Sequence, residues 1–67
     1  MKITFSENLK SLRKNANITQ NQLAKMLEVD QRTISAWEHN VCEPDFNTLA
    51  KLCDIFNEDF NSILSDQ

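Results

Sequence analysis

Residues 20–39 constrain the fold of this chain more than any other stretch, and they read QNQLAKMLEVDQRTISAWEH. The spacing of their apolar residues predicts two short helices joined by a tight turn, one over about residues 20–27 and the other over about residues 31–39. Thr19 and Gln22 have the spacing of a capping box at the start of the first of these helices. The stretch therefore begins with a well-defined helix start.

Each of the two predicted helices has an apolar face, and we expect the two faces to pack together. The residues that form these faces are Leu23, Ala24 and Leu27 in the first helix and Ile34 and Trp37 in the second. Val29 fills the turn between the helices. Asp30 precedes the second helix as an N-cap, where the helix dipole also favours its carboxylate. This is the pattern of a helix-turn-helix unit.

At these residues the chain resembles the Cro and lambda-repressor (Xre-type) family of DNA-binding proteins. Within the central stretch the resemblance is carried by Gln20, Leu23, Ala24, Val29, Ile34 and the run TISAWE at 33–38. The flanks agree, since LKSLRKNANITQ (9–20) resembles the first helix of that family and PDFNTLAKLCDIFNEDFNSIL (44–64) its fourth and fifth helices. The resemblance covers about residues 5–64. It implies an all-α, compact five-helix domain in which helices 2 and 3 form the helix-turn-helix.

The periodicity of the flanks predicts the other three helices. The first runs from residue 5 or 6 to 15, the fourth over about 46–56 after an Asp45 N-cap, and the fifth over about 60–64 after Asp59. The apolar face of the fourth helix consists of Phe46, Leu49, Leu52, Cys53 and Phe56. We expect burial to centre on Leu9, Leu12, Leu23, Leu27, Ile34, Leu49, Leu52 and Phe56. The whole chain is expected to be one domain, with residues 1–4 extended, Thr4 or Ser6 capping the first helix, and a tail at 65–67.

The chain contains no glycine, although average usage of about 7% would give about five. In the family, glycine is usual where a helix ends in a left-handed residue, and here those places hold Asn17, Glu28, Asn40 and Asn57. Asparagine is the next-best residue for this conformation. Glutamate is not suited to this conformation, so we predict a strained turn at Glu28 that costs about 1 kcal/mol relative to glycine.

The net charge of −3 argues against nucleic-acid binding, but the charges are unevenly distributed. Residues 1–40 carry six basic and four acidic side chains, a net of +2, and residues 41–67 carry one basic and six acidic, a net of −5. This asymmetry fits a DNA-facing surface in the first part and a solvated or partner-binding surface in the second. The loop at 40–43 has no basic residue where family members often have one, which predicts weaker affinity.

No enzymatic, metal or cofactor site is expected from the sequence. Cys42 and Cys53 are separated by ten residues, which is neither a redox nor a zinc spacing, so we expect a semi-exposed loop thiol and a buried helix thiol. The one histidine has no second ligand at a suitable spacing. No run is long enough to span a bilayer and no signal peptide precedes the first helix, so we expect a cytoplasmic protein.

The resemblance makes residues 31–39 the recognition helix. The side chains implied in base reading are Gln31, Arg32, Ser35 and Ala36, with glutamine suited to adenine and arginine to guanine. Phosphate contacts are implied for Gln20, Asn21, Thr33 and His39. The alternative for each of these residues is an ordinary exposed helix face. Gln20 is also implied to brace Gln31.

Arg13 and Glu38 occupy the family positions of an ion pair between the first and third helices, and a direct phosphate contact is the lesser reading of Arg13. The leading function is a sequence-specific transcriptional regulator that binds a two-fold symmetric operator in double-stranded DNA as a homodimer. By resemblance, Phe60, Ile63 and Leu64 contact the second copy; the alternative is that they close the core. The second hypothesis is a protein-interaction module on the same fold, such as an antitoxin or antirepressor.

Overall fold

The computed structural model describes residues 5–64, which form five helices and no strand. The helices are α1 (Phe5–Asn15), α2 (Gln20–Leu27), α3 (Gln31–Glu38), α4 (Phe46–Phe56) and α5 (Phe60–Leu64). These bounds confirm the predicted all-α fold, with α3 one residue shorter than expected. The expectations for residues 1–4, including a Thr4 cap, and for the tail at 65–67 lie outside the described residues.

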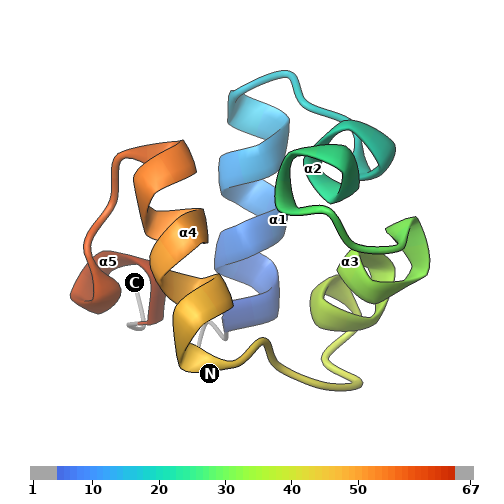
Figure 1. Cartoon of the computed structure of the whole chain (residues 1–67). Coiled ribbons are helices and arrows are strands. Elements are labelled where there is room, and N and C mark those ends of the chain that lie inside the picture. The colour runs from blue at the N-terminus through green and yellow to red at the C-terminus, as the bar shows by residue number, and fades with distance from the viewer. Residues whose placement is uncertain (1–4, 65–67) are drawn as a thin grey trace.

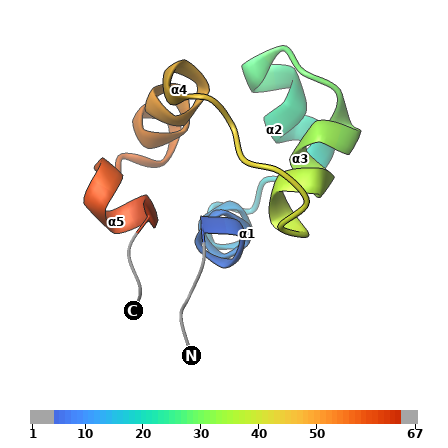
Figure 2. The ribbon, with the colours of Figure 1, turned by 90° about the horizontal axis from the view of Figure 1, so that it is seen from below.

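The five helices surround a single core. α1 lies in the middle, with α2 and α3 on one side and α4 and α5 on the other (Figure 1). The view from below shows the same division, with the α3–α4 connection crossing from one side to the other (Figure 2). Each helix contributes one fully buried side chain to the core, namely Leu9, Leu23, Ile34, Leu52 and Ile63. Every helix is therefore tied into the same apolar cluster.

The N-caps predicted for α2, α3, α4 and α5 are present at the helix starts, whereas Ser6 lies within α1 and is therefore not its cap. The Thr19 side chain accepts from the Gln22 N–H at 3.0 Å and the Gln22 side chain accepts from the Thr19 N–H at 2.8 Å, which completes the capping box. Asp30, Asp45 and Asp59 each accept a backbone N–H at 2.7–2.8 Å. These backbone hydrogen bonds, made to the ionised form, lower the pKa of all three carboxyls.

The four predicted left-handed helix ends are also confirmed. Asn17, Glu28, Asn40 and Asn57 have φ between 55° and 61°. After each of them the next N–H reaches back five residues to a carbonyl, at 2.9–3.1 Å, and the left-handed residue itself reaches back three. This is the Schellman arrangement, which satisfies carbonyls that a helix end leaves open. The chain makes the same helix end four times without a glycine.

The structure corrects three predictions about burial. Phe46 is 71% exposed, so it does not belong to the buried face of α4; it is the first residue of that helix and stacks on Phe60, with ring centroids 5.0 Å apart. Leu12 and Phe56 pack against the core but are only half-buried. Leu12 faces an open hollow described below, which explains its exposure. Conversely, Ser6 is buried at the start of α1.

Candidate nucleic-acid interface

The start of α3 presents the side chains that the sequence implicates in base reading. Burial of Ile34 and Trp37 fixes the rotation of this helix. With that rotation, Gln31 and Arg32 are exposed, and Ser35 and Ala36 are half-buried beside them. These four residues therefore form a continuous accessible face along α3. Their roles toward a ligand remain predictions.

An ion pair connects this region to α1. Arg13 donates from Nε to Glu38 Oε2 at 2.6 Å and from Nη2 to Glu38 Oε1 at 3.1 Å. The side chains are only 11% and 1% exposed, respectively. Burial alone would raise the pKa of the Glu38 carboxyl, but the hydrogen bonds from Arg13 and Gln20 outweigh it and hold that pKa below its ordinary value. Arg13 also donates from Nη1 to the Ile18 carbonyl at 2.8 Å, so its guanidinium is held on two sides.

Two further hydrogen bonds extend the ion pair to the surface. Gln20 Nε2 donates to Glu38 Oε1 at 3.0 Å, and Gln31 Nε2 donates to Gln20 Oε1 at 2.5 Å. The brace between Gln20 and Gln31 had been implied by the family resemblance, whereas the bond between Gln20 and Glu38 had not. We use the name amide relay for this series of four hydrogen-bonded side chains, which are Arg13, Glu38, Gln20 and Gln31.

One sequence signal indicates part of the amide relay. Residues seven apart in a helix lie on the same face, about 10.5 Å apart along the axis. Gln31 and Glu38 have this spacing, so a helix packed across that face can contact both. The sequence alone does not say which residue of α2 lies there, because that depends on how the two helices cross.

Two other predicted residues are engaged locally on α3. Arg32 lies 3.4 Å from the Asp30 carboxylate, with 89% of its side chain exposed, so this pair contributes little to stability. His39 follows the helix, and its Nδ1 lies 2.7 Å from the Ser35 carbonyl oxygen. Nδ1 must therefore carry a proton to make this bond. The neutral ring then has only a lone pair at Nε2, so only the protonated ring can donate to a phosphate.

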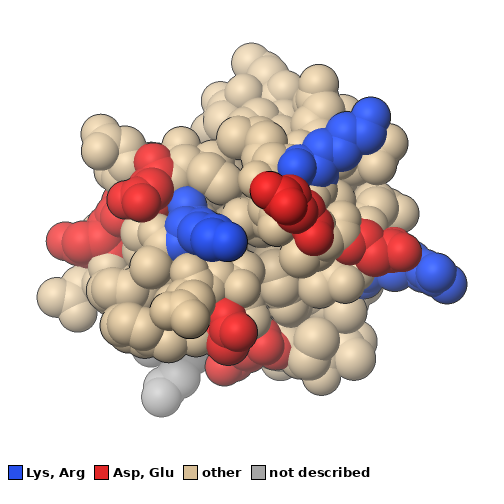
Figure 3. Space-filling model, in the orientation of Figure 1, with Lys and Arg blue, Asp and Glu red and all other residues tan. Residues whose placement is uncertain are grey.

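The predicted phosphate contacts lie around this face. Gln20 and Asn21 begin α2, a helix N-terminus that attracts anions. Asn21 is exposed and Thr33 is half-buried. The loop at 40–43 is exposed and, as expected, presents no basic side chain. Figure 3 shows that basic and acidic groups alternate on one face of the molecule without a continuous basic patch.

The predicted partner contacts on α5 divide into two kinds. Ile63 is fully buried and closes the core, which was the alternative kept open for it, so it offers no surface to a second copy. Phe60 is half-buried, and Leu64 is 48% exposed. The exposed Phe46 ring on α4 stacks on Phe60 and was missing from the prediction. Among the described residues, the accessible apolar surface at this end therefore consists of Phe46, Phe60 and Leu64.

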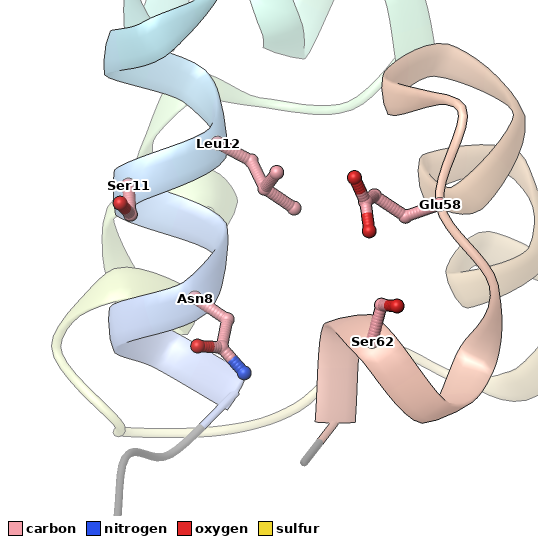
Figure 4. A pocket seen from close by; sticks show the side chains of 5 residues that line it. All are labelled: Asn8, Ser11, Leu12, Glu58 and Ser62. Carbon is pink, nitrogen blue, oxygen red and sulfur yellow. The ribbon is translucent and has the colours of Figure 1, made fainter. Parts of the chain in front are cut away.

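An open hollow of about 300 Å³ lies between α1 and α5, on the side of α1 away from α2 and α3. Asn8 and Leu12 point across it toward Glu58 and Ser62, and Ser11 lies at its edge (Figure 4). Asn8 Nδ2 donates to the Ile63 carbonyl at 2.9 Å, so this side chain joins α1 to α5. The hollow is thus separate from the face formed by α3.

The described residues form neither a metal-binding cluster nor a membrane-spanning helix. In residues 5–64, no group of three His, Cys, Asp or Glu side chains is placed to hold a metal ion. None of the five described helices has the length and apolarity needed to cross a lipid bilayer. Cys42 is exposed in the loop after α3 and Cys53 is buried in α4, both as free thiols, as predicted. Burial raises the pKa of the Cys53 thiol, with smaller contributions from nearby carboxylates.

Curated proteins with similar sequences are regulators. The chain is 35% identical over 63 residues to the HTH-type transcriptional activator BcrR of Enterococcus faecalis, covering 94% of this chain and 31% of that protein. It is 33% identical over 63 residues to the uncharacterized HTH-type transcriptional regulator YqaE of Bacillus subtilis, covering 94% of this chain and 54% of that protein. The chain thus spans about a third to a half of these relatives.

A solved structure extends the comparison. The P22 c2 repressor in complex with a synthetic operator matches with a TM-score of 0.86 and 29% identity, over 92% of this chain and 94% of that one. The profile of the family described as helix-turn-helix domain matches residues 6–66. The resemblance inferred from residues is therefore confirmed: the chain belongs to the helix-turn-helix domain family and has the lambda-repressor-like fold.

Proposed function

We propose that this chain is the sequence-specific DNA-binding domain of a transcriptional regulator, and that it inserts the start of α3 into the major groove. The observation that carries the proposal is the exposed Gln31 side chain, held by the amide relay at the first position of α3. A helix whose first side chains are exposed and fixed is suited to reading base edges. The similarity to HTH-type transcriptional regulators and to the operator-bound P22 c2 repressor supports this assignment.

In this proposal the residues divide into two groups. Gln31 and Arg32 read bases, with contributions from Ser35 and Ala36, whose methyl suits a thymine methyl. Gln20, Asn21, Thr33 and His39 contact phosphates, and Lys10, Lys14 and Lys25 add general attraction. The +2 charge of residues 1–40 supports the placement of DNA on this side.

Selection from a random oligonucleotide pool tests the proposal, followed by titration of the enriched duplex and a scrambled duplex at several salt concentrations. Gln31→Ala and Arg32→Ala should lose preference for the enriched duplex, since a bidentate base contact contributes about 1–3 kcal/mol of discrimination. Lys14→Ala is the matched control. If Lys14 contacts phosphate, its removal should weaken both duplexes alike and lower the salt slope by about one. Full specificity in both α3 variants would contradict the assignment.

We further propose that two copies bind a two-fold symmetric operator through the apolar surface of Phe46, Phe60 and Leu64. The Phe46 ring is 71% exposed, so its removal from water would favour association of two copies. Sedimentation with and without operator measures this. Phe46→Ser should reduce occupancy of the second half-site while one half-site remains bound; equal occupancy would exclude this surface.

The second candidate, a protein-interaction module such as an antitoxin or antirepressor, is favoured by one specific observation. Residues 41–67 carry a net charge of −5, and the loop at 40–43 lacks basic side chains. A DNA-binding domain should still bind random duplex weakly and in a salt-sensitive way. If the chain shows no such binding at low salt, the protein-interaction function is favoured.

A further inference from the structure

We propose that Glu38 is a positioning residue that decides which base Gln31 reads, an inference that rests on the proposed function and deepens it. Glu38 lies at the other end of α3 and is almost fully buried. It acts through Gln20, whose side-chain amide bonds to Glu38 at 3.0 Å on one side and to Gln31 at 2.5 Å on the other. The amide relay thus connects the interior to the exposed start of α3.

The direction of the hydrogen bonds in the relay follows from the carboxylate. An ionised carboxylate can only accept hydrogen bonds, so Gln20 must turn its NH₂ group toward Glu38. The carbonyl oxygen of the same amide then faces Gln31 and can only accept. Gln31 must therefore donate from Nε2. Arg13 holds the carboxylate in place with two hydrogen bonds and favours its ionised form, so the direction is set from inside the protein.

This direction determines what Gln31 offers to a ligand. After donating one N–H to Gln20, its amide retains one N–H and its carbonyl oxygen. Adenine presents an acceptor at N7 and a donor at N6 in the major groove, so it matches both groups. Guanine presents two acceptors, N7 and O6, so it can pair with the remaining N–H of Gln31 but not with its carbonyl oxygen. The opposite direction would leave Gln31 with two N–H groups, which suit guanine. The relay therefore selects adenine over guanine.

The test measures the ratio of affinities for duplexes with adenine or guanine at the position that Gln31 reads. That position is the one at which Gln31→Ala loses its preference. The native chain should favour adenine at least about fivefold, the lower end of one bidentate contact. In Glu38→Gln the new amide can donate or accept, so both relay directions become possible and the ratio should fall toward one.

Gln20→Lys reverses the relay without changing Glu38. A lysine ammonium only donates, so it would donate to both Glu38 and Gln31, leaving two N–H groups of Gln31 free. The preference should then shift toward guanine. Met26→Lys is the matched control, because it adds the same charge on an exposed part of α2 and should change all affinities by one factor. An unchanged adenine-to-guanine ratio in Glu38→Gln and Gln20→Lys overturns the inference.

Measurements on the free protein separate this inference from the proposed function. Glu38→Gln removes a charge beside Arg13, so circular dichroism is used to check that this variant folds. If Glu38→Gln does not fold, Gln20→Lys provides the test. Nuclear magnetic resonance of the Gln31 side-chain amide should show one protected N–H in the native chain and none in Gln20→Met. If the Gln31 amide of Gln20→Met keeps its protected N–H while operator binding is intact, the inference is overturned and the proposed function stands. If the pool yields no enriched duplex, the proposed function fails and the inference fails with it.

Discussion

The two sides of α1 are held in different ways. On the side of α2 and α3, a buried ion pair and two amide hydrogen bonds connect three helices, from Arg13 to Gln31. On the side of α4 and α5, the apolar packing of Leu52 and Ile63 in the core is accompanied by a side-chain hydrogen bond, from Asn8 to the Ile63 carbonyl, beside an open hollow of about 300 Å³. Directional bonds fix orientation, whereas apolar contacts fix only proximity. The first side is therefore suited to present side chains accurately, and the second to close the core.

The same division appears in charge and exposure. Residues 1–40 have a net charge of +2 and residues 41–67 of −5. Among the described residues, the aromatic side chain that is largely exposed is that of Phe46, and it lies on the side of α4 and α5. The proposed base-reading face thus lies on the side of α2 and α3, and the proposed contact between copies lies on the side of α4 and α5. Substitutions on each side of α1 should show how far its stability depends on its own type of contact.

The largest effect is expected from breaking the ion pair. Arg13→Ala should lower the free energy of unfolding by about 3 kcal/mol, because it leaves the buried Glu38 carboxylate without its cation. Urea denaturation measures the loss. Lys14→Ala, at the exposed neighbouring position, is the control and should change stability by less than about 0.5 kcal/mol. Equal midpoints for the two variants would show that polar bonds do not hold this side.

Lowering the pH should weaken the same pair without a mutation. The pKa of Glu38 is lowered in the folded chain, so its contribution is present above the ordinary glutamate pKa of about 4.5 and is lost as the pH falls through the folded value. The native chain should therefore lose more stability between pH 6 and pH 3 than Glu38→Gln does. The exposed caps Asp30, Asp45 and Asp59 titrate in both proteins and cancel in the comparison. Parallel pH profiles would contradict this.

A smaller effect is expected on the other side of α1. Ile63→Val removes one methylene from a fully buried position and should cost about 1 kcal/mol. Leu64→Ala, on the exposed neighbour, should cost less than about 0.5 kcal/mol at low protein concentration. Thermal unfolding at two protein concentrations measures both. A larger loss for Leu64→Ala would mean that association, rather than core closure, stabilises α5.

The smallest effect is expected at the turn between α2 and α3. Glu28 has φ 60°, so Glu28→Gly should raise the free energy of unfolding by several tenths to about 1 kcal/mol. Asn57→Gly is the matched control at the same kind of helix end, and its gain should be smaller because asparagine tolerates this conformation. Urea midpoints of the two variants decide the matter. No gain for the glycine at position 28 would show that this turn is not strained.

Much of the fold was predictable from interactions between residues that are close in the sequence. The helix bounds follow from apolar spacing together with Thr19, Asp30, Asp45 and Asp59, each of which acts on an N–H within three residues. The left-handed helix ends follow from the residues that occupy them. The pairing of Arg13 with Glu38 was available only through the family resemblance, since the two residues are 25 apart in the chain.

The sequence by itself thus determined the five helices and the face that α3 exposes, because caps, helix ends and periodicity depend on neighbours along the chain. Only the tertiary structure decided that Ile63 closes the core while Phe46 remains in solvent, since that depends on how α5 lies against α1 and α4. It also decided that Gln20 lies between Glu38 and Gln31. A hydrogen bond needs atoms within about 3 Å in the right direction, and spacing along one helix cannot specify how another helix crosses it.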